Sequence, residues 1–471
     1  MRASQTATLS TERRIPSESE IQEFQTGLRG HLLRPDAPDY DTARRIWNAM
    51  IDRSPALIAR CTGAADVVRS VNFARYMGLP LSVRGGGHNV SGNAVCDGGL
   101  MIDLSPMKGI RVQPAQLVAR AEAGCTWRDF DQETQAFGLA TTGGVIPTTG
   151  IAGLTLGGGM GWLMRKHGLS CDNLLSVDVV TADGHLVTAS HAENPDLFWA
   201  MRGGGGNFGI ATSFEFRVHP VGQVIGGMVA HTMERAHDAL RFFRDFALSA
   251  PEDLGVMAAF VTGPDGQRLL AIFVCYSGPL AEGERVLAPL RAFGPPLVDQ
   301  IAAMPYLQLQ SLLEPGFPAG QQNFWKSNFL RELSDASIDL LVDFFKRVPS
   351  PTSAMAIEYL GGAVGGVKAD DTAFAHRDEL FNLLIVGIWP DPADNRDHIE
   401  WVRELWHAMQ PHSTGGVYVN YLGRTPDEGP DRVRAAYGNE KYDRLVVLKR
   451  KYDPTNVFSL NQNIDPAMRK D

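Results

Sequence analysis

The sequence predicts an α+β protein of two domains, the second built on an antiparallel sheet flanked by helices. The chain has 471 residues, enough for two or three structural units at about 100–200 residues each. Strand and helix patterns alternate from residue 56 to about residue 219. About half of the 49 glycines lie between Arg84 and Gly209, and glycine clusters become sparse beyond Pro220. This change in composition predicts a domain boundary near Pro220.

The first half of the chain opens with a polar stretch, residues 1–35, which we expect to be a flexible N-terminal arm. A β-α-β unit follows, with a helix between Thr62 as N-cap and Gly78 as C-terminal stop. The dipeptide Asp183-Gly184 between two apolar segments predicts a hairpin. The other strands and helices are expected over residues 56–59, 79–83, 100–104, 110–112, 117–121, 127–137, 195–201 and 210–218.

The second half, from residue 220 to about 417, alternates helices with strands, and we interpret it as a mainly antiparallel sheet with helices. The expected helices cover residues 236–248, 281–293 and 338–347, and the expected strands cover 256–261, 269–276, 354–360 and 380–388. The tail from about residue 418 is polar and loop-like around one expected helix, 442–452.

Composition excludes several classes of protein. Hydrophobic residues make up 44% and charged residues 21% of the chain, which is typical of a globular protein. The net charge of −9 argues against sequence-independent binding to nucleic acid. Apolar runs stay shorter than the roughly 20 residues of a membrane helix, so we expect no membrane association. Five widely spaced cysteines without a C-x-x-C pattern predict neither disulfides nor a metal site, and they favour a reducing, cytoplasmic location.

The segment from Arg84 to Gly92, RGGGHNVSG, follows an expected strand. Three successive glycines can turn their backbone N–H groups toward one anion, as phosphate-binding loops do. The sequence alone leaves open whether this segment binds phosphate or is an ordinary loop.

A second glycine-rich segment, Thr141 to Asn173, is nearly uncharged and would suit a planar aromatic ligand lying on bare backbone. An ordered loop of that length without a ligand would be unusual in a compact domain. The G-x-G-x-x-G pattern at Gly204, Gly206 and Gly209 follows an expected helix and precedes a strand. A dinucleotide fingerprint needs the order strand, turn, helix, so we reject a Rossmann site.

These segments resemble the FAD-linked oxidases of the vanillyl-alcohol-oxidase superfamily, in the branch of the berberine-bridge-enzyme-like proteins. That branch includes hydroxynicotine, oligosaccharide and aclacinomycin oxidases. Five ordered motifs carry the resemblance, namely residues 84–89, 143–173, 194–209, 418–421 and 452–458. It implies a two-domain, PCMH-type FAD-binding fold. The FAD-binding domain would combine residues 36–219 and 418–471, and residues 220–417 would form the substrate-binding domain.

The resemblance implies that FAD is bound covalently through His88, with Arg84 to Asn89 wrapping its pyrophosphate. Part of the family has a second link through a cysteine, but Ile146 stands at that position, so we expect a single link. Cys171 lies too far along the chain to substitute and is expected to be a buried small residue. The residues expected to contact the cofactor are His88, Arg84, Gly85, Gly86, Gly87, Asn89, Gly92, Thr148, Thr149, Gly153, Gly158, Asp172, Asn173, Gly209, Ile210, Asn461 and Asn463.

Tyr421 matches the tyrosine that acts as catalytic base in several relatives, and Asn420 is expected to orient the substrate. A free tyrosine has a pKa near 10, so a cation or hydrogen-bond donors would have to stabilise its phenolate. Ordinary aromatic packing is the alternative for Tyr421. Lys326 lies where relatives carry a lysine that faces the flavin, although a snorkelling surface lysine is equally consistent with the sequence.

The resemblance implies an FAD-dependent oxidase that acts on a small organic substrate and on O₂. Hydride would pass from a hydroxyl- or amine-bearing carbon to flavin N5, and reoxidation by O₂ would give H₂O₂. Thr149, at the position proposed to gate oxygen, has nearly the shape of valine and favours oxidase activity. The alternatives are a flavin dehydrogenase, an oxidative tailoring or cyclising enzyme of secondary metabolism, and a non-catalytic FAD-binding protein. The sequence leaves the substrate and the oligomeric state open.

Overall fold

The computed structural model describes residues 14–423 and 428–468. The stretch expected to be a flexible arm is ordered where it is described, which corrects that expectation. Helix α1 (Glu18–Thr26) begins with a capping box in which Ser17 and Glu20 bond each other's backbone N–H groups. Phe24 of α1 stacks on Phe73, with ring centroids 4.2 Å apart. Residues 1–13 of the expected arm lie outside the described residues.

The first sheet has four strands in the order β1-β2-β4-β3. Strands β2 (Leu57–Arg60), β4 (Leu100–Asp103) and β3 (Leu81–Arg84) are parallel, whereas β1 (His31–Leu33) is antiparallel to β2. Helix α3 (Ala64–Met77) connects β2 to β3 and ends at Gly78, whose φ of 62° is left-handed, as the sequence predicted. The glycine-rich loop therefore starts at the carboxyl end of a parallel strand.

The second sheet has five antiparallel strands in the order β5-β6-β10-β8-β9. They are β5 (Ile110–Gln113), β6 (Val118–Glu122), β8 (Leu174–Val180), β9 (Leu186–Ser190) and β10 (Ile210–Arg217). The predicted hairpin is confirmed, because β8 pairs with β9 across the turn at Asp183-Gly184. The other helices of this half of the chain are α2 (Tyr40–Arg44), α4 (Trp127–Gln135), α5 (Ile151–Leu156), α6 (Met164–His167) and α7 (Pro195–Met201). A small ribbon joins β7 (Leu139–Ala140) to β11 (His219–Pro220).

The third sheet has eight strands, all antiparallel, and is formed between Gln223 and Trp389. Its order is β15-β12-β14-β13-β18-β19-β17, with β16 pairing β12. Its strands are β12 (Gln223–Thr232), β13 (Leu254–Thr262), β14 (Arg268–Tyr276), β15 (Val298–Asp299), β16 (Ala302–Pro305), β17 (Gln322–Leu330), β18 (Ala354–Tyr359) and β19 (Phe381–Trp389). This is the antiparallel sheet expected from the sequence.

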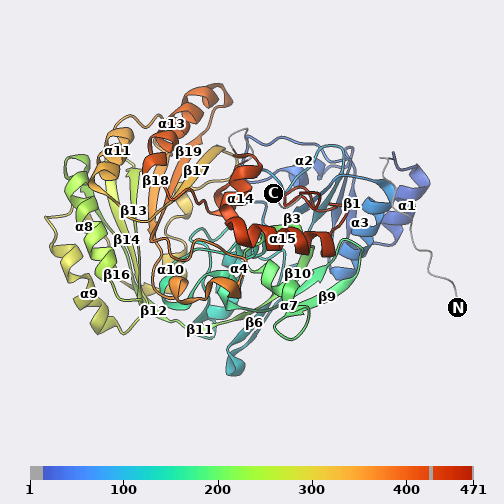
Figure 1. The fold of residues 1–471 in the computed structure, drawn as a ribbon, viewed down its shortest axis with the longest axis horizontal. Coiled ribbons are helices and arrows are strands. Elements are labelled where there is room, and N and C mark those ends of the chain that lie inside the picture. The colour runs from blue at the N-terminus through green and yellow to red at the C-terminus, as the bar shows by residue number, and fades with distance from the viewer. Residues whose placement is uncertain (1–13, 424–427, 469–471) are drawn as a thin grey trace.

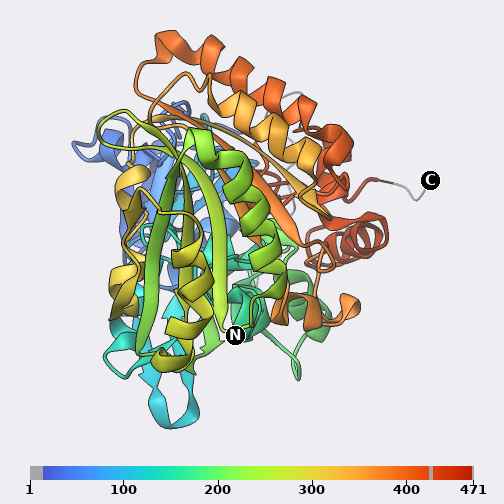
Figure 2. The ribbon, with the colours of Figure 1, turned by 90° about the vertical axis from the view of Figure 1, so that its left-hand side faces the viewer.

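Helices cover the outer face of this large sheet, and its inner face turns toward the rest of the molecule (Figures 1 and 2). The outer helices are α8 (Ala236–Ser249), α9 (Leu280–Ala292), α11 (Asp335–Phe345) and α13 (Asn395–Ala408). They share a buried apolar cluster with the sheet that includes Phe243, Leu341, Val402 and Ile385. Two shorter helices, α10 (Tyr306–Gln310) and α12 (Ala363–Gly366), lie in the connections between strands.

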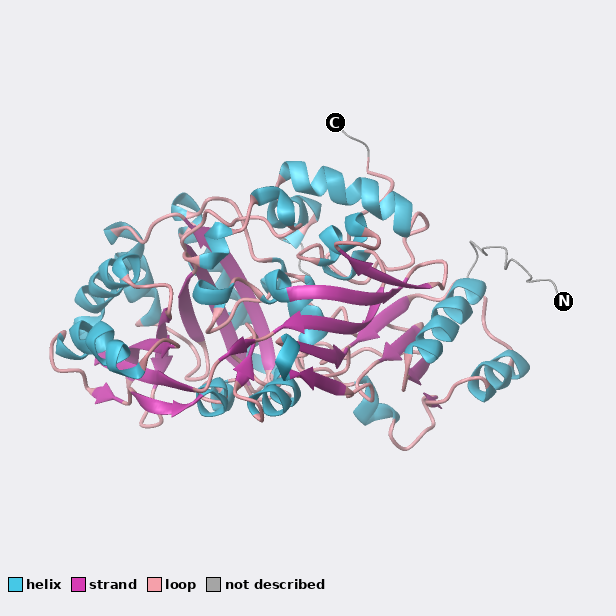
Figure 3. Ribbon diagram, turned by 90° about the horizontal axis from the view of Figure 1, so that it is seen from below, coloured by secondary structure: helices cyan, strands magenta, loops and turns pink. Residues whose placement is uncertain are grey.

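The C-terminal segment returns to the first half of the chain. Helix α15 (Asn439–Tyr452) packs on α7, and α14 (Pro430–Tyr437) packs on α15 (Figure 1). Residues from Val417 to Ile464 belong to the same buried cluster as strands β4, β6 and β8. Helices lie around the outside of the sheets when the molecule is seen from below (Figure 3). No helix within residues 14–423 and 428–468 is long and apolar enough to cross a bilayer.

Candidate active site

A large cavity lies between the two smaller sheets, the C-terminal segment and the inner face of the large sheet. Its volume is about 330 Å³, within the range of about 300–1,000 Å³ that is usual for small-ligand sites. Its lining comes from segments far apart in the chain, namely residues 81–94, 144–156, 205–211, 418–421 and 458–462, with side chains of β13, β17, β18 and β19. The lining thus brings segments of the first half of the chain and the C-terminal segment together with the inner face of the large sheet.

The glycine-rich loop after β3 forms one wall of this cavity as bare backbone. The N–H groups of Gly86, Gly87, His88 and Asn89 donate no hydrogen bond to another described residue, which leaves them available to an anion. Gly86 packs directly on Gly150, and a Cβ at Gly86 would fall 2.4 Å from the Gly150 nitrogen. This close approach of two backbones requires glycine at both positions.

Two further glycines of the lining face open space. A Cβ placed on Gly153 or on Gly206 would meet nothing within 4 Å, although both residues line the cavity. The open side of each glycine is therefore a surface on which a flat ring system can lie without touching a side chain. This arrangement fits FAD, whose phosphates need free N–H groups and whose ring needs a flat surface.

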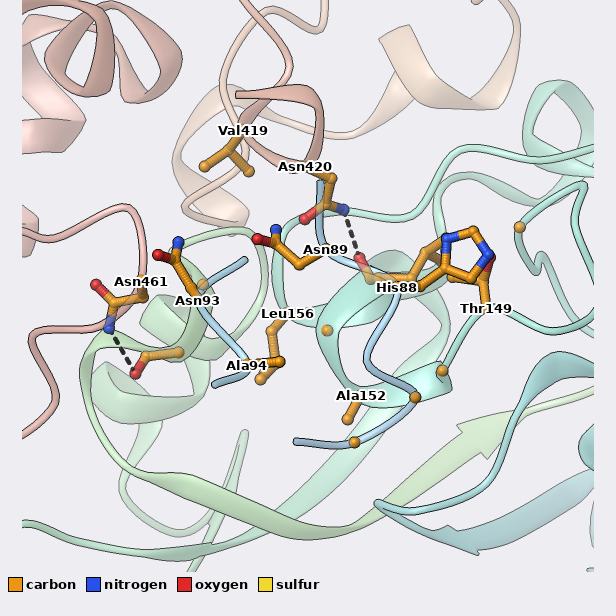
Figure 4. A pocket seen from close by; sticks show the side chains of 18 of the residues that line it. His88, Asn89, Asn93, Ala94, Thr149, Ala152, Leu156, Val419, Asn420 and Asn461 are labelled. Atoms are coloured by element: carbon orange, nitrogen blue, oxygen red, sulfur yellow. Dashed lines mark hydrogen bonds between the residues drawn. The ribbon is translucent and has the colours of Figure 1, made fainter. Parts of the chain in front are cut away.

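His88 lies beside Thr148 and Thr149, at one end of the cavity in Figure 4. Its Nε2 is 3.5 Å from the Thr148 hydroxyl, and its ring stacks on Trp47 with centroids 4.3 Å apart and planes 17° apart. Burial among protein atoms lowers the pKa of His88 to about 4. The imidazole is therefore neutral at pH 7 and has a free lone pair, as a nucleophilic nitrogen requires.

Asn461 closes the opposite end of the cavity (Figure 4). Its amide donates to the carbonyls of Gly206 at 3.1 Å and Phe458 at 2.9 Å, while its Oδ1 is buried without a hydrogen-bond partner among the described residues. The turn before it is held by Asp453, which accepts from the N–H groups of Val457 and Phe458. An unpartnered buried oxygen that lines a cavity is an acceptor for a bound ligand.

Tyr421 and Glu358 form the polar group on the large sheet's side of the cavity. The Tyr421 hydroxyl donates to Glu358 Oε1 at 3.2 Å, and the Asn382 amide donates to Glu358 Oε2 at 2.7 Å. Burial raises the pKa of Glu358 to about 7. Burial and the nearby carboxylate raise the pKa of Tyr421 well above its usual range. At neutral pH Tyr421 therefore stays protonated, and Glu358 is the group that exchanges a proton.

Asn420 fixes the segment that carries Tyr421. Its amide donates to the Leu154 carbonyl at 3.0 Å and to the Tyr418 hydroxyl at 2.7 Å, and the Tyr418 hydroxyl in turn accepts from the Gly159 N–H at 2.8 Å. These bonds join the C-terminal segment to the block around α5. Asn420 also lines the cavity (Figure 4), where it was predicted to orient a substrate.

The structure brings most of the predicted site residues to this one cavity. Those that line it are His88, Gly85, Gly86, Gly87, Asn89, Thr149, Gly153, Gly209, Ile210, Asn461, Asn420 and Tyr421. Thr148 is just behind the lining, beside His88. Ile146, at the position of the missing second-link cysteine, also lines the cavity. Cys171 is fully buried, as predicted.

The remaining predicted residues lie outside the lining and contact protein. Arg84 donates to the Ala43 carbonyl, Gly92 packs on Ile51 and Gly158 packs on Phe374 and Tyr418. Asp172 pairs with Arg377 at 2.6 Å, and Asn173 accepts from His219 at 2.7 Å. Asn463 has a buried oxygen without a described partner, although it is not part of the lining. These residues support the walls of the cavity.

Lys326 is placed away from the cavity, and we correct the prediction that it faces a flavin. Its position on β17 is opposite Ile385 of β19, on the face of the sheet that packs under α13. Its ammonium group pairs with Glu428 at 2.5 Å, with both side chains only 1% exposed, and lies 4.8 Å from the ring of Trp406. The preceding residue, Trp325, points to the other face and lines the cavity.

Glu358 is the functional residue that the sequence analysis missed. It lies in β18, within a segment that the sequence predicted only as a strand. Its position opposite Asn382 in the register of β18 and β19 brings its partner to it. A lone acidic residue in an apolar strand was the available signal, because carboxylates are rarely buried without a partner.

Comparison with known proteins agrees with this geometry. Residues 55–190 match the model of an FAD binding domain, and residues 417–465 match the model described as berberine and berberine like. The chain is 34% identical to (R)-6-hydroxynicotine oxidase of Paenarthrobacter nicotinovorans, over 93% of this chain and 97% of that protein. It is 32% identical to an FAD-linked oxidoreductase of Dictyostelium discoideum, over 95% and 97% of the two chains. The chain belongs to the berberine-bridge-enzyme-like FAD-linked oxidoreductases.

Solved structures of this family have the same architecture. The crystal structure of 6-hydroxy-D-nicotine oxidase from Arthrobacter nicotinovorans superposes with a TM-score of 0.85 at 30% identity, covering 93% of this chain and 98% of that one. The berberine-bridge-enzyme-like protein 1 of Physcomitrella patens gives a TM-score of 0.86 at 25% identity, covering 96% and 100%. This FAD-linked oxidoreductase therefore has the PCMH-type fold.

Proposed function

We propose that this FAD-linked oxidoreductase is an oxidase that acts on a hydroxyl- or amine-bearing carbon of a small organic molecule. The observation that carries the proposal is that the Glu358–Tyr421 pair and the His88 loop open onto the same cavity. When bound, FAD supplies the acceptor for the hydride and passes the electrons on to O₂, which becomes H₂O₂. The residues of the chain have to supply binding, orientation and removal of one proton.

Glu358 takes that proton. Oxidation of an alcohol or amine removes a hydride from carbon and a proton from oxygen or nitrogen, leaving a C=O or C=N bond. With a pKa of about 7, the Glu358 carboxylate is ionised in a large fraction of molecules at neutral pH. Tyr421 stays protonated and holds the carboxylate in place through its hydroxyl. This assigns the base to Glu358 and a positioning role to Tyr421, in place of the phenolate expected from the sequence.

His88 would attach the cofactor covalently in this proposal. Its neutral imidazole, stacked on Trp47, has the lone pair that bond formation requires. Ile146 offers no second nucleophile. The cofactor would therefore be held by one bond, through His88.

The test begins with the purified holoenzyme precipitated in acid. We expect the yellow colour to stay with the pellet for the native protein and to move to the supernatant for His88→Ala. Thr148→Val is the control, because it keeps the shape of the neighbouring residue and leaves His88 intact. A colourless pellet from the native protein would rule out the covalent link.

Oxidase activity is tested separately, with an oxygen electrode and a peroxide assay over a panel of alcohols and amines. We expect substrate-dependent O₂ consumption with one H₂O₂ formed per O₂. Reduction of the flavin under nitrogen with slow reoxidation in air would contradict the oxidase and favour a dehydrogenase. A flavin that no member of the panel reduces would favour a non-catalytic FAD-binding protein.

A further inference from the structure

The wall of the cavity opposite the glycine-rich loops consists of side chains from the large sheet and from the segment before β17. Six of them are apolar or aromatic: Met257, Leu313, Phe317, Trp325, Ala356 and Leu384. They come from β13, β17, β18, β19 and the residues around Glu314–Gly316. Glu358 is the acidic side chain of this wall within the described residues.

The polar atoms of this wall already have partners. The Trp325 Nε1–H donates to Asn323 Oδ1 at 3.2 Å, and the Tyr421 hydroxyl donates to Glu358. The Asn382 amide is also used by Glu358. The Glu358 carboxylate keeps acceptor capacity beyond these two bonds, since it can accept about four. Within the described part of the chain, the wall thus offers a substrate one strong acceptor.

The aromatic rings of this wall are arranged edge to face. The Trp325 and Phe317 ring centroids are 6.3 Å apart with planes at 82°, and the Trp325 and Tyr421 centroids are 6.0 Å apart with planes at 72°. Leu384 shares the cluster around Trp325. Rings in this arrangement present both faces and edges, and both contact another aromatic ring favourably.

We propose that the substrate is an aryl-substituted alcohol or amine with a single polar group, and that sugars are excluded; this rests on the proposed function. The ring lies against Phe317, Trp325 and Leu384. The one hydroxyl or amine group lies at Glu358, gives its proton to the carboxylate, and its carbon gives up the hydride. The product is the aryl aldehyde, ketone or imine.

A sugar fails in this site for a physical reason. Each of its several hydroxyl groups would lose hydrogen bonds to water on entering. The described wall offers the Glu358 carboxylate as one acceptor in their place. An unpaired polar group that loses water is costly, and this cost discriminates strongly between ligands. An aryl compound loses little hydration and buries apolar surface.

The test mixes the holoenzyme anaerobically with benzyl alcohol, benzylamine and their ring-substituted homologues, and separately with glucose and cellobiose. The bleaching of the flavin absorbance gives the rate of reduction. We expect kcat/KM at least 100-fold higher for the better aryl compounds than for either sugar. Faster reduction by a sugar would overturn this inference and leave the proposed oxidase function standing.

Ligand binding separates the two proposals. Phenol and aniline resemble the substrate class, but the carbon that bears their hydroxyl or amine group has no hydrogen to give up as hydride. Methyl glucoside is the matched sugar ligand. We expect phenol or aniline, and not methyl glucoside, to perturb the flavin absorption spectrum at millimolar concentration. If phenol or aniline perturbs the spectrum while no compound reduces the flavin, the proposed oxidase function is wrong but the assignment of an aryl-binding site stands. If none of the three ligands perturbs the spectrum and no aryl compound reduces the flavin, the inference is wrong.

A variant pair tests the wall itself. Phe317→Ala removes one ring of the wall and leaves the backbone carbonyl that accepts from Trp47. We expect KM for aryl substrates to rise about tenfold with kcat nearly unchanged. The reason is that the ring contact would bind the substrate equally well in the ground state and in the transition state. Phe137→Ala is the control, because Phe137 is 53% exposed and lies outside the lining. An unchanged KM for Phe317→Ala would contradict the assignment of this wall to the aryl group.

Discussion

The two walls of the cavity are built in opposite ways. The wall around Gly86, Gly150 and Gly153 is bare backbone from a loop and from helix α5, and at Gly86 and Gly150 two segments of the chain touch so closely that a side chain has no room. The wall formed by the large sheet is side chain, with Trp325, Leu384 and Glu358 projecting from three different strands. In the proposed function, the first wall would contact FAD and the second would contact the substrate.

This difference predicts which property of the enzyme a substitution in each wall will alter. A substitution at a glycine that touches another backbone segment should disturb both the fold of the loop and the binding of FAD, whereas one at an open glycine should disturb the binding of FAD alone. A substitution in the side-chain wall leaves the backbone hydrogen bonds of the sheet intact, so it changes rate or selectivity. Each prediction below would break or sharpen that distinction.

The largest effect is expected for Glu358→Gln, which keeps the shape of the side chain and its bond from Asn382 but removes the base. A positioned base is worth about 10²–10⁴-fold, so the rate of flavin reduction should fall by that factor with FAD content unchanged. Stopped-flow reduction under nitrogen measures it. Tyr421→Phe removes one bond to the carboxylate and should cost about tenfold. Native reduction rates in Glu358→Gln would show that the side-chain wall takes no part in the chemistry.

Lys326→Met tests the outer face of the same sheet. Without Lys326, the buried Glu428 carboxylate keeps Arg432 as a partner at 3.4 Å, so the free energy of unfolding should fall by less than the about 3–5 kcal/mol of a fully broken buried pair. Urea unfolding measures this loss. Replacing both partners, Lys326→Met with Glu428→Leu, should recover much of it, since apolar pairs often replace buried ion pairs without loss. Because Lys326 lies away from the cavity, kcat per bound flavin should stay native. A lower kcat would indicate that Lys326 takes part in the active site after all.

Gly150→Ala tests the backbone wall. Its Cβ would fall 2.5 Å from the Gly86 nitrogen, and the forced shift should cost about 1–3 kcal/mol together with part of the bound FAD. Gly153→Ala is the matched variant, because its Cβ meets no protein atom within 4 Å. It should lose FAD without destabilising the apoprotein, because Gly153 lies in helix α5, where alanine is favoured over glycine. Equal thermal stability and FAD content in both variants would contradict the distinction between touching and open glycines.

The smallest effect is expected for Glu314→Gln. Glu314 lies three residues before Phe317 and pairs with Arg128 of α4, with side chains 32% and 44% exposed. Exposed pairs contribute about 0–1 kcal/mol, so stability should change little and KM for an aryl substrate by less than about threefold. Salt titration of KM in the native protein provides the control. A tenfold change in KM would show that this pair holds the Phe317 segment over the site.

The sequence predicted the backbone wall far better than the side-chain wall. The loop from Gly85 to Asn89 is contiguous, so its residues could be identified without knowing any long-range contact. The position of Glu358 depends on the register of β18 against β19, and whether Trp325 or Lys326 faces inward depends on the phase of β17. A shift of one residue exchanges the two faces of a strand, and sequence pattern alone does not set that phase when both faces are buried.

Helix α1 was missed for another reason. The polar composition of residues 1–35 suggested a flexible arm, but the Ser17-x-x-Glu20 capping pattern was present in the sequence. The pairs Asp172–Arg377 and Lys326–Glu428 join residues more than 100 positions apart, so no local pattern could predict them. The family resemblance assigned Asp172 to the cofactor, and its ion pair with Arg377 was not visible from the sequence.

The pH dependence of flavin reduction tests the central claim most directly. Burial raises the pKa of Glu358 to about 7, and the carboxylate is the active form, so the base is lost as the pH falls through that value. The rate constant of anaerobic reduction, measured from about pH 5.5 to 9, should rise with a midpoint near 7 for the native enzyme. In Glu358→Gln the residual rate should lose this transition. A transition near 7 that survives in Glu358→Gln, or its absence from the native profile, would contradict the account.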